Sequence, residues 1–137
     1  MRKILLGTAF SVALLATSCS TTKTADTKKE EKLATVVGTK WQLADATGTA
    51  LPTIKIADEQ KMIGNASCNN FSAQIKMNPD GSFFAKNVIS TRMTCKHIDT
   101  EVNFLNMLRK ANRYKVTAKR LELYQNEILL LKFNRMP

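Results

Sequence analysis

The segments Ser67-Cys68-Asn69-Asn70-Phe71 and Thr91-Arg92-Met93-Thr94-Cys95 bracket the middle of the chain. Their two cysteines, with 26 residues between them, are predicted to be the ends of a clamp across a small β-rich domain. In an exported protein such cysteines usually pair, and a bond of this span stabilises a domain by roughly 3 kcal/mol. Two buried thiols and a redox switch remain alternatives, although the spacing lacks the C-x-x-C pattern of thioredoxin-like proteins.

Around this pair the chain alternates between apolar and polar residues, which is typical of half-buried strands. Phe71, Ala73, Ile75 and Met77 fall on one face, and the run Asn78-Pro79-Asp80-Gly81 after them predicts a tight turn. Strands are expected at 39–43, 53–56, 61–64, 71–77, 82–85, 114–117, 121–124 and 128–133. Core positions are expected at Trp41, Met62, Met77, Met93, Met107 and the apolar run 128–131.

One segment changes to three- and four-residue spacing, which predicts a helix. Asp99 is expected to cap its start, and Glu101 suits its positive end. The side chains expected to pack on the sheet are Val102, Phe104, Leu105 and Leu108. The sequence therefore predicts a mainly β fold with one helix (α+β): a small antiparallel β-sheet or open barrel of about seven or eight strands with one packed helix.

The first eighteen residues determine the expected location of the protein. Met1-Arg2-Lys3 is followed by a mostly apolar run over 4–16, which is typical of a signal peptide and short for a membrane span. The run ends Leu15-Ala16-Thr17-Ser18-Cys19, which resembles a bacterial lipobox with Cys19 as the lipidated residue. An ordinary cleaved signal peptide is the alternative. Two acyl chains, such as palmitate, are enough for stable anchoring.

Composition divides the rest of the chain into a tether and a domain. Residues 19–37 hold almost no side chains to bury, so we expect a lipidated N-terminus and a disordered tether. Residues 38–137 form one predicted domain, which carries 15 basic and 8 acidic residues of a chain whose formal net charge is +10. The basic excess therefore belongs to the domain, and such an excess favours acidic partners.

Four motifs in order along 38–137 resemble the META domain family, which includes HslJ-like, heat-shock-inducible envelope proteins. These motifs are Trp41-Gln42-Leu43, Cys68-Asn69-Asn70-Phe71, Thr91-Arg92-Met93-Thr94-Cys95 and Leu121-Glu122-Leu123. The family pattern has glycine before Cys-Asn, where this chain has Ser67, and glycine after the Phe, where it has Ser72-Ala73. The resemblance implies a small, mostly β fold with a packed helix and an association with stress or secretion. It does not imply an enzyme.

Candidate contact residues lie in the Cys-Asn motif and in a basic run over 109–120. Asn69 and Asn70 are expected to form a turn, and they could also shape a binding loop with Arg92 beside them. The basic run is a solvated face or a surface for anionic envelope material such as lipid headgroups or lipopolysaccharide phosphates. Its members are Arg109, Lys110, Arg113, Lys115, Lys119 and Arg120.

No motif in the sequence predicts catalysis. The only histidine, His97, lacks partners at metal-ligand spacing, so no metal and no cofactor are expected. We therefore expect a non-enzymatic, monomeric lipoprotein of the bacterial envelope that is anchored in a membrane, most simply the outer membrane. Both the periplasmic and the surface side of that membrane remain alternatives. It would bind an anionic envelope component or protect against stress. The alternative is an inhibitor or partner-docking protein that uses the basic run. Export removes nucleic acid from the expected partners.

Overall fold

The computed structural model describes residues 36–46, 50–96 and 98–137. The predicted leader, Cys19, most of the tether and His97 lie outside these residues. The described elements are β1 (Lys40–Leu43), β2 (Thr53–Asp58), β3 (Lys61–Asn65), β4 (Asn70–Met77), β5 (Phe83–Ser90), α2 (Ile98–Lys110), β6 (Arg113–Val116), β7 (Arg120–Gln125) and β8 (Ile128–Arg135). The mainly β fold with one helix is confirmed for this part of the chain.

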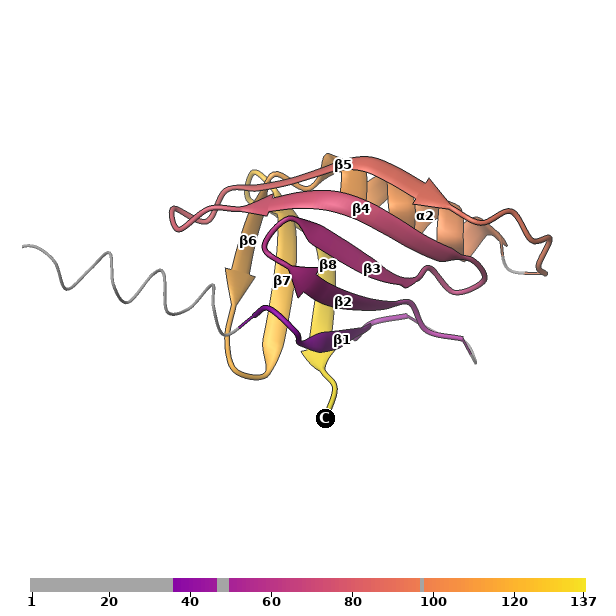
Figure 1. Ribbon diagram of the computed structural model, residues 1–137, viewed down its shortest axis with the longest axis horizontal. Helices are drawn as coiled ribbons and strands as arrows, with labels where there is room; N and C mark the ends of the chain where they lie inside the picture. Colours follow the sequence, from indigo (N-terminus) through magenta and orange to yellow (C-terminus); the bar gives the residue numbers. More distant parts are fainter. Residues whose placement is uncertain (1–35, 47–49, 97) are drawn as a thin grey trace, which may run out of the picture.

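The eight strands form one antiparallel sheet in the order β5-β4-β3-β2-β1-β8-β7-β6. The sheet curls into a half-barrel, so that β6–β8 lie behind β1–β4 in Figure 1. Its two edge strands meet at one end only, through a bridge between Ser82 and Arg113. At that end the predicted turn at 78–81 joins β4 to β5, with Gly81 at a φ of 88° that suits glycine. The predicted hairpin is therefore confirmed.

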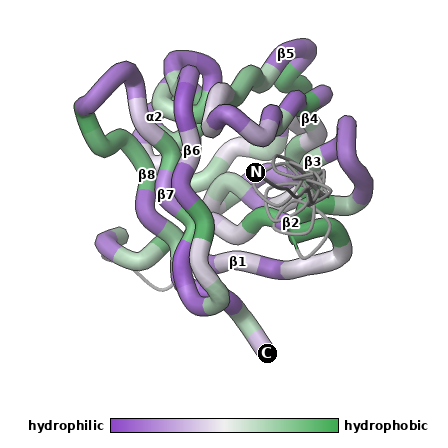
Figure 2. Tube along the Cα trace, turned by 90° about the vertical axis from the view of Figure 1, so that its left-hand side faces the viewer, coloured by the Kyte–Doolittle hydropathy of each residue, from purple (hydrophilic) through white to green (hydrophobic). Residues whose placement is uncertain are grey.

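The concave side of the sheet is filled by alternate side chains of every strand. Figure 2 shows apolar and polar positions alternating along the strands. The largest fully buried side chains are Trp41, Phe83, Phe104, Phe133, Ile54, Ile56, Met62, Leu108, Leu121 and Leu123. Val36 is also buried, and Thr39 donates from its backbone N–H to the Val36 carbonyl at 3.2 Å. The packed domain thus includes residues before the predicted boundary at 38.

Helix α2 packs against β5 and β8 beside the opening of the half-barrel. The Phe104 ring lies edge-on to Phe71 at 5.6 Å and to Phe133 at 6.2 Å, measured between ring centroids. The prediction for Val102 was wrong, because this side chain is 48% exposed and Glu101 is buried in its place. The helix also begins at Ile98, so Asp99 lies inside its first turn instead of before it.

Other apolar side chains expected in the core are exposed. Met93 lies 59% exposed after β5, whereas Met62 and Met77 are buried as predicted. Ile128 and Leu129 form the start of β8 but are 66% and 45% exposed. These two residues follow the β7–β8 turn, where the hairpin extends past the concave core. The expectation of a fully buried apolar run at 128–131 was therefore wrong in its first half.

Candidate functional site

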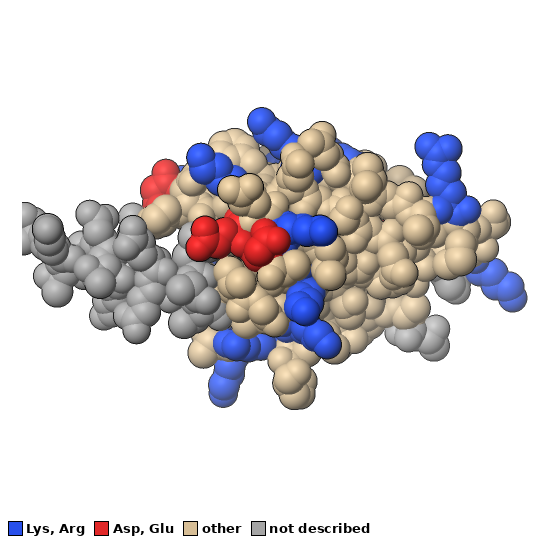
Figure 3. Space-filling model, viewed as in Figure 1, with Lys and Arg blue, Asp and Glu red and all other residues tan. Residues whose placement is uncertain are grey.

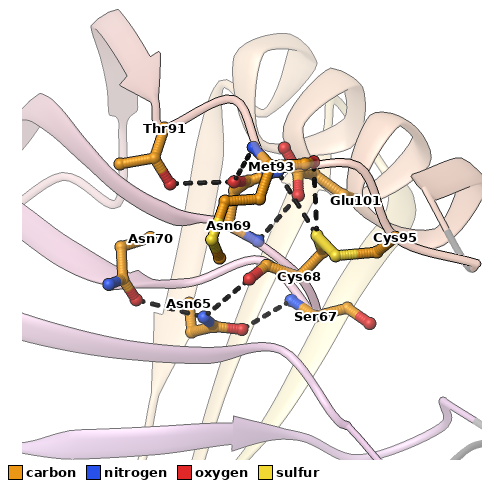
Figure 4. Close-up of a disulfide and its surroundings, with 9 residues drawn as sticks. All are labelled: Asn65, Ser67, Cys68, Asn69, Asn70, Thr91, Met93, Cys95 and Glu101. Carbon is orange, nitrogen blue, oxygen red and sulfur yellow. Dashed lines mark hydrogen bonds between the residues drawn. A yellow bond between two sulfur atoms is a disulfide. The ribbon is translucent and has the colours of Figure 1, made fainter.

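A disulfide joins Cys68 to Cys95 and marks the first candidate site (Figure 4). Cys68 lies just before β4 and Cys95 lies in the connection from β5 to α2, with their Cα atoms 6.1 Å apart. Both residues are half-buried. The pairing therefore ties the loop between β3 and β4 to the start of the helix, which is the clamp that the sequence predicted.

Asn69 connects the two sides of this clamp through its side chain. Its Oδ1 accepts hydrogen bonds of 2.8 Å from both the Thr91 hydroxyl and the Met93 backbone N–H. Its Nδ2 donates to the Met93 carbonyl at 3.1 Å and approaches the Cys68 sulfur at 3.4 Å. An amide group has about four hydrogen-bonding positions, and these contacts occupy them all.

The main chain of Asn69 is bound to the helix as well. Its backbone N–H donates to Oε2 of Glu101 at 2.9 Å, and both residues are buried. The Glu101 carboxylate therefore satisfies a donor in the loop between β3 and β4 that would otherwise be buried without a partner. This contact explains why a charged residue, and not Val102, faces the sheet at the first turn of α2.

Asn65 and Ser67 shape the loop before Cys68. Oδ1 of Asn65 accepts from the Ser67 backbone N–H at 3.0 Å, and Nδ2 of Asn65 donates to Oδ1 of Asn70 at 3.0 Å. Ser67 has a φ of 97°, a conformation that residues with a Cβ rarely adopt. The glycine of the family pattern would fit this backbone without strain, so the sequence departs from the pattern at a strained position.

These contacts correct the prediction of a ligand surface in the Cys-Asn motif. Asn69 is 1% exposed and its amide is fully used inside the protein, so it lies on no surface. Asn70 and Arg92 are exposed, as the prediction requires. The motif therefore supplies a structural clamp, and the predicted turn-forming role of the asparagines is the one with direct support.

The basic run over 109–120 separates into two parts in the structure. Arg109 and Lys110 end α2, and Arg109 donates to the Val88 carbonyl of β5 at 3.3 Å. Arg113 and Lys115 follow on β6, where the Lys115 ammonium lies 4.9 Å from the centre of the Tyr124 ring. Lys119 and Arg120 lie past the other end of β6, in and after the turn to β7. The predicted set is not one continuous patch.

Lys119 instead joins basic residues that are distant in the sequence. A surface groove of about 540 Å³ is lined by Gly38, Thr39, Lys40, Ala118, Lys119, Arg135, Met136 and Pro137. Arg135 is fixed there, since its Nη1 donates to the Ala118 carbonyl at 3.4 Å and its guanidinium lies 5.8 Å from the Trp41 ring centre. We call Lys40, Lys119 and Arg135 the three-cation groove. No acidic side chain is among its described lining residues.

Sequence reasoning missed a second set of cations on the convex side of β1–β5. Within these strands the buried residues alternate with lysines, as in Ile54-Lys55-Ile56 and Ile75-Lys76-Met77. The same period-2 alternation that predicted the strands places these lysines on one outer face. The lysines of this surface lie singly on separate strands between Lys40 and Lys86, so no dense basic run in the sequence marks them.

A third surface groove lies between the β4–β5 turn and the β6–β7 hairpin, and it holds both tyrosines. The Tyr114 hydroxyl donates to the Asn78 carbonyl at 3.0 Å, and burial, followed by the nearby Asp80 charge, raises the pKa of Tyr114 above 10.0. Tyr124 donates to Glu122 at 2.7 Å, and this hydrogen bond is the first cause that raises the pKa of Tyr124. Both hydroxyls are thus held as proton donors.

The residues that the structure describes contain neither a cluster of metal ligands nor a helix able to span a membrane. Within these residues, no three His, Cys, Asp or Glu side chains form a group that could hold a metal ion. In the same part of the chain, no helix has the length and apolar character needed to cross a membrane. The expected absence of a metal stays a prediction for the whole chain.

An antiparallel half-barrel packed on one helix, with a disulfide clamp beside the helix, defines a class of small, mainly β domains. A family model of the META domain matches residues 33–136. The chain therefore belongs to the META domain family. No curated protein matches the chain.

Two solved structures share the fold. An NMR structure of a protein from Burkholderia xenovorans has a TM-score of 0.64 at 20% identity, over 77% of this chain and 87% of that chain. A second NMR structure has a TM-score of 0.61 at 22% identity, over 74% of this chain and 92% of that chain. At these identities the similarity establishes the fold alone.

Proposed function

We propose that this META-domain protein is a non-enzymatic binding module of the bacterial cell envelope, anchored through a lipid on Cys19. Its ligand in this proposal is a phosphate-bearing envelope component, either lipopolysaccharide or an anionic lipid headgroup, and binding would serve a protective role under stress. The observation that carries the proposal is the three-cation groove, where Lys40, Lys119 and Arg135 converge from separate segments.

The chemistry of this groove suits phosphate. A guanidinium presents fixed donors that match phosphate oxygens, while lysines supply mobile point charges. Arg135 is held by the Ala118 carbonyl and the Trp41 ring, so little of its side-chain freedom is left to lose on binding.

Support for export and anchoring comes from the leader and the lipobox-like end at Ala16-Thr17-Ser18-Cys19. A mass measurement of the N-terminal peptide of the protein isolated from bacterial membranes tests this part of the proposal. Acylation of Cys19 is the expected result. A mature peptide that begins at Cys19 or later without a lipid would contradict the anchor.

Ligand binding is tested separately, with a chain that starts at residue 19 and carries Cys19→Ser so that no lipid is attached. The probes are purified lipopolysaccharide and phosphatidylglycerol vesicles, each at low and high salt. Charge reversal by Lys119→Glu with Arg135→Glu is expected to weaken binding about tenfold or more, because each basic residue near an anionic surface contributes about 1 kcal/mol. Preference for one probe identifies the source of the phosphate.

Arg113→Glu with Lys115→Glu provides the matched control, since it reverses the same number of charges beyond the groove. If this control weakens binding and the groove variant does not, the three-cation groove is not the site. That outcome favours the second candidate function, docking of one protein partner. It is suggested by Arg113, Lys115 and the two tyrosines around the groove at β6. Loss of one specific complex from envelope extracts in the control variant would support it.

A further inference from the structure

We propose that the convex face of β1–β5 is a membrane-contact face that lays the domain on an anionic bilayer, with Phe84 and Ile89 entering the interface. This inference rests on the proposed function for export and anchoring, and it adds a second site on the convex face, which shares Lys40 with the three-cation groove. The partner is the bilayer surface itself, not a soluble ligand.

The first argument is the charge of the face. Strand pairing places the outward-facing charged side chains of these strands in adjoining rows, with Lys40 directly opposite Lys55 and Lys61 in register with Gln74, which in turn faces Lys86. The outward-facing charges within β1–β5 are Lys40, Lys55, Lys61, Lys76 and Lys86, with Asp58 at the end of β2. Like charges directly across a strand pair destabilise a sheet. An anion bound from outside would therefore reduce the repulsion between these lysines.

The second argument is the pair of apolar side chains among these lysines. Phe84 is 46% exposed and Ile89 is 66% exposed, and both line a shallow groove of about 1020 Å³ on this face. Phe84 lies directly opposite Lys76, and Ile89 lies opposite Ser72. The lysines Lys61, Lys76 and Lys86 border the same groove. Aromatic and aliphatic side chains ringed by lysines are typical of surfaces that lie in a membrane interface.

A β-bulge in β5 is what brings Ile89 to this face. The pairing shifts between Ser72 and Gln74, so that β5 gains a residue there, and Asn87 adopts a φ of 49°. Asn87 Nδ2 donates to Gln74 Oε1 at 2.7 Å and fixes the bulge. Without the extra residue, the alternation that places Phe84 and Lys86 outward would turn Ile89 inward. The bulge therefore adds an apolar side chain to the convex face.

The third argument is where the chain enters the domain. The Gly38 backbone N–H donates to the Ile56 carbonyl at 2.7 Å, and β2 leads directly into the turn whose residues Asp58 and Gln60 border the groove. The eighteen residues from Cys19 to Val36 can span at most about 60 Å, so a lipid on Cys19 keeps this end of the domain within that distance of the bilayer. Figure 3 shows this side of the molecule with acidic side chains in its left half, basic side chains beside them, and further basic side chains at its right-hand edge.

The test uses Phe84→Trp as a reporter in the chain from residue 19 with Cys19→Ser. The native Trp41 is 1% exposed, so it should be shielded from quenchers in the membrane. With vesicles that contain phosphatidylglycerol and brominated lipids, we expect the new tryptophan to be quenched and its emission to shift to the blue. Ile128→Trp is the control, because Ile128 is also exposed, at 66% against 46% for Phe84, but lies on the β7–β8 hairpin.

Charge reversal then tests the role of the lysines. Lys55→Glu with Lys76→Glu is expected to lower vesicle partitioning at least tenfold, since each lysine near an anionic surface contributes about a fivefold change. At vesicle concentrations that bind all of the protein, Lys119→Glu with Arg135→Glu should leave quenching at position 84 in place. Circular dichroism confirms that each variant folds.

Three outcomes would overturn the inference. These are an unquenched reporter on vesicles that bind the protein, equal quenching of both reporters, and stronger binding to single-stranded nucleic acid than to vesicles. Because no lipid is attached in this experiment, a failure here leaves the Cys19 anchor untouched. Conversely, unlipidated Cys19 in cells leaves the vesicle result standing.

Discussion

The backbone N–H of Asn69 donates a 2.9 Å hydrogen bond to the carboxylate of Glu101, and both residues are buried. The contact joins the loop before β4 to the first turn of α2, at the same place where the Cys68–Cys95 disulfide joins them covalently. One polar link and one covalent link therefore hold the helix beside the opening of the half-barrel. Each link can be removed separately.

Glu101→Ala should destabilise the domain by about 1–3 kcal/mol, because it leaves a buried backbone donor without a partner. Glu101→Gln keeps an acceptor oxygen and should recover part of that loss. Urea unfolding followed by circular dichroism measures both. Val102→Ala is the control at the exposed neighbouring position, and a loss there as large as in Glu101→Ala would contradict the role of the hydrogen bond.

Removal of the disulfide in the double variant Cys68→Ser/Cys95→Ser should cost about 3.5 kcal/mol, because the bond restricts the unfolded chain over a separation of 27 residues. Thermal unfolding of the native and variant chains under non-reducing conditions measures the difference. The companion measurement counts free thiols in denaturant, on a chain that keeps Cys68 and Cys95 and carries Cys19→Ser. Two free thiols before reduction would show that the bond does not form.

Ser67→Gly should stabilise the domain by about 1 kcal/mol, because glycine adopts a φ near 97° without steric conflict. The hydrogen bond from the Ser67 backbone to Asn65 is unaffected by the change. Ser72→Gly, inside β4 and without a positive φ, should instead destabilise by about 1 kcal/mol. Denaturant midpoints that move in the same direction for both variants would refute the explanation.

Gly64→Ala should destabilise the sheet by about 1–3 kcal/mol. A Cβ atom at this position would lie 2.0 Å from the Thr53 carbonyl oxygen and 2.9 Å from a Phe71 ring carbon, so β2 and β4 would have to move. Chemical denaturation at neutral pH provides the measurement. An unchanged midpoint would mean that the strands move apart at no cost.

Tyr114 predicts a dependence of stability on alkaline pH. Its pKa is raised in the folded protein, first by burial and then by Asp80, so the folded state holds the phenolic proton more tightly than the unfolded chain. Its contribution is present below pH 10 and is lost as the pH rises through the folded pKa. Tyr114→Phe should therefore lose less stability than the native protein between neutral pH and pH 11, as measured by urea unfolding at each pH.

The strands of this protein were predictable because their signal is local. The alternating residues Phe71, Ala73, Ile75 and Met77 are the four buried side chains of β4. The turn after Met77 could be predicted from the residues of the turn alone. The disulfide was predictable once the leader suggested export. Val102, Met93 and Ile128 were misplaced because hydrophobicity alone does not show where a helix or hairpin leaves the core.

The candidate sites were harder to predict, because they depend on strand order. Lys119 was predicted in one run with Arg113, but the sheet pairs it with the far end of the chain, beside Arg135 and Lys40. The convex lysines each occur alone in the sequence. Only the pairing of each strand from β1 through β5 with its neighbour brings them onto one face. No local pattern encodes which strands become neighbours.

By itself, the sequence determined the composition of the elements: short alternating strands, one amphipathic helix, tight turns, two cysteines available to pair, and a basic domain. Those features follow from side-chain period and backbone preference, which act over a few residues. The tertiary structure alone decided that Asn69 and Glu101 meet inside, that the basic run divides, and that lysines from separate strands share a surface. These outcomes depend on contacts between residues distant in the chain, whose free energy is set by packing and not by neighbours in sequence.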